Sequence, residues 1–165
     1  MTHASGRTPK GFFNAVPVIA GTAFFIILFS GCPEKTGKLQ IRDTVSGRIY
    51  GQWVPGESME FAIEFIHSVN MSPVRETYRI EDGKLRPVSV RFHSFGAGML
   101  SDLDEGRILT RDGDAMIISG FGASYSKLGY IVGTVSDHVL FINDEVISLR
   151  DLCGRNAHIT IQYKR

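Results

Sequence analysis

The chain has few cysteines, almost no net charge and no internal repeat. Its 165 residues contain two cysteines, Cys32 and Cys153, so a disulfide framework is not expected. Its 18 basic and 17 acidic side chains leave a formal net charge of +1. This balance removes the electrostatic footprint of a general nucleic-acid-binding protein, and we expect no nucleic-acid partner.

The chain also lacks the common catalytic signatures. It has no G-x-S-x-G elbow and no phosphate-binding loop with Gly-Lys-Ser/Thr. His67 and Ser68 are neighbours, but successive side chains of a strand point to opposite faces, so Ser68 would not reach the imidazole of His67. We therefore expect a protein that is not an enzyme and needs no cofactor, with a hydrolase as the least favoured alternative.

The first 32 residues differ from the rest. Arg7 and Lys10 precede "FFNAVPVIAGTAFFIILFSGC", which carries no charge, and this layout is typical of a secretory signal. The final "FSGC" resembles a bacterial lipobox, with Phe29 where leucine is usual, and predicts lipidation of Cys32. The alternative is an uncleaved anchor helix over residues 11–31, which approaches the roughly 20 apolar residues that a spanning helix needs.

Either anchor places the rest of the chain outside the cytoplasm, because the basic residues of the N-terminus stay inside. The predicted organisation is a signal or anchor over residues 1–32, a tether over 33–38 and one domain over 39–165. We expect it at the cell membrane, lipid-anchored or single-pass, with the domain facing the periplasm or the cell exterior. Cys153, left without a partner by lipidation of Cys32, is expected to be a small buried residue near a turn.

The domain reads as strands and turns. "FAIEFI" alternates most clearly, with Phe61, Ile63 and Phe65 on one face, and Asp-Gly pairs mark turns at residues 82–83 and 112–113. No sustained helical period is present. About eight short strands predict an all-β fold, an antiparallel sandwich or a barrel. The expected core consists of Phe61, Ile63, Phe65, Val88, Val90, Phe92, Ile117, Leu140, Ile142, Ile159 and Ile161.

Histidines and glycines supply the candidate binding residues. A metal site using His67 and His138 is possible in chemical terms, but it would need tertiary contact because no two histidines are spaced as a local pair. The alternative for each is a core histidine held by a carbonyl or a carboxylate. In "SFGAGML", Gly96 and Gly98 predict either a β-bulge or a nest of backbone amides that binds an anion.

Three stretches together resemble a known family. "FIHSVNMSPVRETY", "FHSFGAGM" and "DHVLFI" are similar, in this order, to the signature blocks of small exported bacterial proteins grouped as domain of unknown function 1850. The resemblance spans roughly residues 51–161. It departs from the pattern at Asp137, where asparagine is usual, and at Met99 and Leu100, which replace Leu-Pro. The site residues that it implies are His67, Ser68, Glu76, Ser94, Gly96, Gly98 and His138.

The family has no established activity, so the resemblance implies a role only by association. Its members often accompany tripartite (TRAP) transporters of the TAXI type, and we therefore expect an accessory or binding module whose partners are the membrane and the subunits of such a transporter. We also predict that His67 and Glu76 face each other across the turn at residues 68–73. That pair would form either a polar network that fixes strand register or the floor of a ligand or partner site.

Overall fold

A computed structural model describes residues 37–93 and 106–165 of the chain. Within these ranges it contains eleven strands and one short helix. The elements are β1 (Lys38–Asp43), β2 (Ile49–Trp53), β3 (Glu60–Ile66), β4 (Pro73–Glu81), β5 (Lys84–Phe92), β6 (Ile108–Asp112), β7 (Ala115–Ser119), β8 (Leu128–Ile131), β9 (His138–Ile142), β10 (Glu145–Ser148), α1 (Leu149–Cys153) and β11 (His158–Lys164).

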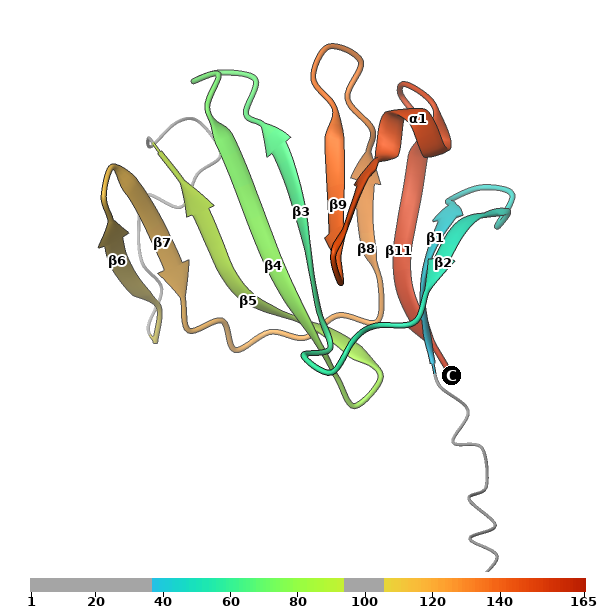
Figure 1. The fold of residues 1–165 in the computed structure, drawn as a ribbon, viewed down its shortest axis with the longest axis horizontal. Coiled ribbons are helices and arrows are strands. Elements are labelled where there is room, and N and C mark those ends of the chain that lie inside the picture. The colour runs from blue at the N-terminus through green and yellow to red at the C-terminus, as the bar shows by residue number, and fades with distance from the viewer. Residues whose placement is uncertain (1–36, 94–105) are drawn as a thin grey trace, which may run out of the picture. The chain divides into compact units, whose positions relative to one another are not determined.

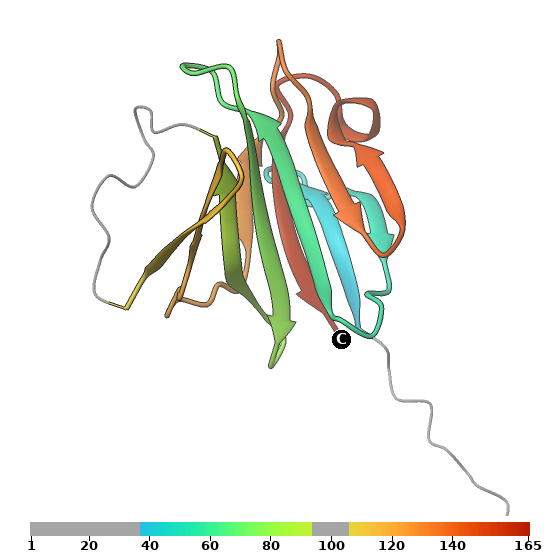
Figure 2. The same cartoon turned by 60° about the vertical axis from the view of Figure 1, so that its left-hand side comes forward.

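The strands form two antiparallel sheets that face each other (Figures 1 and 2). The smaller sheet has the order β2-β1-β11-β8, and the larger has the order β10-β9-β3-β4-β5-β7-β6. The all-β prediction is confirmed, and the architecture is an open sandwich rather than a closed barrel. The number of strands exceeds the expected eight partly because some strands, such as β6, are short. β6 is also exposed along its whole length, so its sequence shows no alternation of apolar and polar residues.

The core lies between the two sheets, where alternate side chains of each strand meet. Phe61 and Ile63 of β3, Leu140 of β9 and Ile161 of β11 are almost completely buried there. Of the other expected core residues, Phe92, Ile142 and Ile159 are also buried, while Phe65, Val88, Val90 and Ile117 are half-buried. The predicted inward face of β3 and β9 is therefore correct, although Ala62, on the other face of β3, is buried as well.

Ile117 is the clearest error in the predicted core. Its neighbours Met116 and Ile118 are buried, as is Ala115, and Ile118 packs in a second cluster with Val74 and Phe92. Three consecutive apolar residues satisfy both phases of an alternating pattern, so the sequence could not indicate which face of β7 is buried.

The two ends of the sandwich differ in what they carry. The described chain enters β1 at Lys38, which pairs with Lys164 of the last strand, so the entry point and the C-terminus lie at one end. The β3–β4 turn and the β8–β9 loop lie at the opposite end (Figures 1 and 2). This geometry separates the start of the domain from the pocket described below.

Several predictions fall on residues outside the described ranges. They are the signal or anchor over residues 1–32 with Cys32, most of the tether, and the glycine-rich stretch with Ser94, Gly96 and Gly98. Within residues 37–93 and 106–165, no helix is long and apolar enough to span a bilayer.

Candidate functional site

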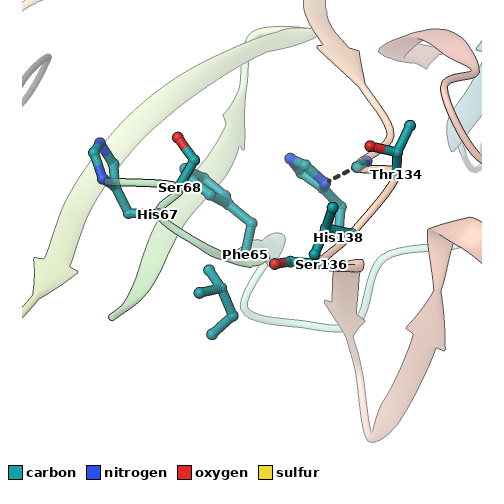
Figure 3. A pocket seen from close by; sticks show the side chains of 9 residues that line it. Phe65, His67, Ser68, Thr134, Ser136 and His138 are labelled. Atoms are coloured by element: carbon teal, nitrogen blue, oxygen red, sulfur yellow. Dashed lines mark hydrogen bonds between the residues drawn. The ribbon is translucent and has the colours of Figure 1, made fainter. Parts of the chain in front are cut away.

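A pocket of about 330 Å³ opens between the β3–β4 turn and the β8–β9 loop. His67 and Ser68 line it from the first segment, and Ser136 and His138 line it from the second (Figure 3). Phe65, near the end of β3, forms part of its wall. The structure therefore brings together three of the site residues named from the sequence, although about 70 positions separate the two segments.

His138 is held in place by two aromatic rings. It is the first residue of β9 and lies opposite Phe65 of β3, and the two rings stack with centroids 5.1 Å apart and planes 21° apart. Tyr130 of β8 contacts the imidazole edge-on, at 6.1 Å between centroids. Burial lowers the pKa of His138, although the negative charges of Asp137 and Glu76 oppose this shift. The imidazole is therefore neutral at physiological pH.

The hydrogen bonding of His138 selects one tautomer. Its Nδ1 accepts a hydrogen bond from the backbone N–H of Gly133 at 3.1 Å (Figure 3). A neutral imidazole carries a single proton, so that proton lies on Nε2. In the part of the chain that the structure describes, Nε2 forms no hydrogen bond. His138 thus offers an N–H donor to a bound group.

His67 lies in the turn that follows β3 and shapes that turn. Its backbone N–H donates to the carbonyl of Ser72 at 2.9 Å, and its Nδ1 accepts from the N–H of Val69 at 3.3 Å. In Figure 3 the ring of His67 projects away from that of His138, with Ser68 and Phe65 between them. The two imidazoles line the same pocket but do not converge on one point.

The predicted pairing of His67 with Glu76 is wrong. β3 and β4 do form the expected antiparallel hairpin, but Glu76 lies opposite Ile63, and the last pair of the ladder joins Ile66 to Pro73. The prediction treated His67 as a strand residue, whereas the strand ends one residue earlier. Register follows from which side chains β3 and β4 bury, and that information is spread over both strands.

Glu76 instead joins the two sheets through phenol hydroxyls. Its Oε2 accepts hydrogen bonds from Tyr78 at 3.0 Å and from Tyr130, and the two hydroxyls lie 3.1 Å apart. Tyr130 belongs to the smaller sheet and Glu76 to the larger. Burial raises the pKa of both tyrosines, and the charge of Glu76 raises it further. We call Glu76, Tyr78 and Tyr130 the inter-sheet cluster.

Only part of this cluster could be predicted from the sequence. Glu76 and Tyr78 are two residues apart on one strand, which places them on one face. Tyr130 lies 54 positions from Glu76, and nothing in the local pattern of β8 identifies it as a partner.

Asp137, which precedes His138, stabilises the start of α1. Its carboxylate accepts hydrogen bonds from the N–H of Arg150 and from the hydroxyl of Ser148.

Residues 37–93 and 106–165 contain no group of three or more histidine, cysteine or acidic side chains placed to hold a metal ion. A histidine that binds metal through Nε2 normally carries its proton on Nδ1 and donates it to an oxygen. In both His67 and His138 the Nδ1 atom accepts a backbone N–H instead. These two residues therefore present N–H donors rather than lone pairs to the pocket.

The fold and the pocket define an antiparallel β-sandwich domain with a small pocket at one end. The family described as Domain of unknown function (DUF1850) matches residues 61–149, which is more than half of the chain. The chain belongs to this family. Searches of curated proteins and of solved structures each returned no match.

Proposed function

We propose that this protein is an extracytoplasmic binding module, tethered to the membrane by its N-terminus, that assists a solute transporter of the tripartite TAXI type. The observation that carries the proposal is the pocket itself. His67, Ser68 and His138, from two separate motif blocks, line one opening at one end of the sandwich. A well-formed pocket with a few convergent polar groups is where a binding site is expected.

The position of the pocket fits a tethered module. The described chain enters at Lys38, at the opposite end from the β3–β4 turn and the β8–β9 loop. A tether that precedes Lys38 therefore leaves the pocket end free to meet a partner. The signal or lipobox pattern of residues 1–32 supports such a tether, and the resemblance to proteins that accompany TAXI-type transporters supports the choice of partner.

The metal-binding alternative has less support. It requires His67 and His138 to converge with deprotonated Nε2 atoms, whereas their Nδ1 atoms accept backbone hydrogen bonds. A binding role that uses N–H donors agrees better with this hydrogen bonding.

Affinity purification from native membranes tests the proposal. The tag belongs at the C-terminus, because the final strand ends at Lys164, away from the pocket. We expect the membrane subunits of a tripartite transporter to co-purify with the full-length chain. His67→Ala should reduce their yield at least tenfold, while His158→Ala, an exposed histidine of the smaller sheet, should leave it unchanged. Absence of transporter subunits, or equal loss in both variants, would refute the proposal.

A further inference from the structure

We infer that the pocket end binds an uncharged, apolar peptide segment of a partner protein, and that the Nε2–H of His138 donates to a main-chain carbonyl of that segment. The inference rests on the proposed binding function and names the chemistry of the partner. Three independent features support it: the exposed apolar side chains around the pocket, the backbone conformation of Met71, and the charges near His138.

The two loops that border the pocket both carry exposed apolar side chains, of which Ile66 and Val135 line the pocket itself. In the β3–β4 turn, Val69 is 64% exposed and Met71 is 65% exposed. In the β8–β9 loop, Val135 is 85% exposed, and Ile66 at the end of β3 is 37% exposed. Apolar residues gathered beside an opening, with polar groups inside it, are typical of a protein interaction site. We call Ile66, Val69, Met71 and Val135 the apolar rim.

Met71 occupies a backbone conformation that a methionine does not favour. Its φ is 52°, in the left-handed region, where glycine or asparagine costs less. The residue nevertheless carries a long apolar side chain into solvent. Methionine at this position is therefore unfavourable in two ways, in its backbone conformation and in the exposure of its apolar side chain to water. A residue that does not stabilise the fold points to a role in binding. Methionine also suits a contact surface because its flexible thioether adapts to different partners.

The charges near His138 select against ionic ligands. Among the described residues, no lysine or arginine lines the pocket, and the charges that act on His138 are those of Asp137 and Glu76, both negative. The guanidinium of Arg150 is nearby but donates to the carbonyl of Val135, so a carboxylate or a phosphate would find no counter-charge in the lining. A cation would find no carboxylate in the lining, because Asp137 is hydrogen-bonded at α1 and Nε2 of His138 is a donor. A neutral carbonyl satisfies that donor without adding charge.

The size of the pocket favours a peptide over a small molecule. About 330 Å³ lies near the lower end of the range for ligand pockets. A molecule enclosed there would leave Val69 and Met71 in water, whereas a peptide segment or a protein surface would cover them.

The first test uses a phage-displayed library of random peptides panned against the full-length chain in nanodiscs. We expect enrichment of uncharged sequences rich in aliphatic residues. The strongest peptide should bind Met71→Asn and Val135→Asp at least tenfold more weakly than the unchanged chain. Val45→Asp is the matched control, because Val45 is 93% exposed in the β1–β2 turn, outside the pocket lining, and it should bind normally. Enrichment of charged peptides, no enrichment, or equal binding by Met71→Asn would overturn the inference.

Met71→Asn keeps the test independent of folding, because asparagine tolerates the left-handed conformation and the variant should melt at the same temperature or higher. Nitrogen-15 spectroscopy of the imidazoles adds a second readout. We expect His138 to be protonated on Nε2 in the free protein and its Nε2 resonance to shift when the peptide is added. A proton on Nδ1 of His138 would overturn the inference. Binding of the protein to phosphatidylcholine vesicles through Met71 and Val135, in place of peptides, would overturn it as well.

The outcomes separate this inference from the proposed function. Selective peptide binding without co-purified transporter subunits would leave the peptide site intact and refute the transporter role. Co-purified subunits whose yield is unaffected by Met71→Asn and Val135→Asp would support the transporter role and reject the apolar rim as the contact surface.

Discussion

Phe65 and His138 lie opposite each other on β3 and β9, and their rings stack with centroids 5.1 Å apart. Phe65 also packs against both apolar clusters, and His138 contacts Tyr130 of the other sheet edge-on. Both residues line the pocket, and His138 also contacts Tyr130 of the inter-sheet cluster. Changes in the cluster should therefore alter the pocket.

Phe65 and His138 should show a measurable coupling in stability. We expect a double-mutant cycle with Phe65→Leu and His138→Leu to give a coupling free energy of about 0.5–1.5 kcal/mol, the range found for aromatic pairs. Urea unfolding of the four proteins measures it. A cycle that pairs Phe65 with Tyr50, on β2 of the smaller sheet, is the control and should be additive. Additive effects of Phe65 and His138 would mean that the stacking contributes nothing.

His138 should make the domain less stable at mildly acidic pH. Its pKa is lowered in the folded state, mainly by burial, so below about 6.5 the unfolded chain binds the proton more readily than the folded one. The free energy of unfolding should therefore fall as pH decreases through the window just below 6.5. Chemical unfolding at a series of pH values measures this, and His138→Phe, which keeps a ring at this position, should flatten the dependence. Equal slopes in the two proteins would contradict the prediction.

Glu76→Gln should lower the pKa of both Tyr130 and His138. The charge of Glu76 raises the pKa of each group, and glutamine removes the charge while keeping an oxygen that can accept a phenol hydrogen bond. Ultraviolet titration reports the tyrosines and proton NMR reports the imidazole. Glu76→Ala, which also removes the acceptor, should cost about 1–3 kcal/mol of stability. An unchanged pKa of His138 in Glu76→Gln would show that the cluster and the pocket are electrostatically independent.

Met71→Asn should stabilise the isolated protein slightly. The left-handed conformation at φ 52° is strained for methionine, and asparagine should recover up to about 1 kcal/mol. Thermal unfolding of the full-length chain measures the change. Asn156, which already occupies the left-handed region at φ 59°, provides the reverse control, and Asn156→Met should destabilise by a similar amount. Destabilisation by Met71→Asn would show that the methionine side chain supports the fold.

Cys153 should react slowly with thiol reagents while the protein is folded. Burial raises the pKa of its thiol to about 11, against the opposing charge of Arg48. At pH 8 the thiolate fraction is then on the order of 0.1%, and the thiolate is the reactive form. We expect alkylation to accelerate at least tenfold in denaturant. A chain with Cys32→Ser isolates the signal of Cys153, and fast labelling of the folded protein would contradict the prediction.

The local patterns of the sequence were sufficient for the strands but not for their register. Phe61 and Ile63 were correctly placed in the core because alternation within β3 is a property of a few consecutive residues. Glu76 was placed opposite His67, which lies one residue beyond the last ladder pair of Ile66 with Pro73, because the end of β3 depends on what β4 buries.

The site shows the same limit. His67, Ser68 and His138 could be named from the motif blocks, and they do line one pocket. The contribution of Tyr130 and the tautomer of His138 could not be predicted, because both depend on the β8–β9 loop and on the packing of one sheet against the other.

The sequence by itself determined an all-β domain, its hairpins and most of its buried faces, because alternation and turn residues act over a few neighbouring positions. Only the tertiary structure decided that Glu76 joins the two sheets, that Phe65 stacks on His138, and that an apolar rim borders a pocket of hydrogen-bond donors. These relationships join residues that are more than 50 positions apart, and they follow from how complete strands pack rather than from any local preference.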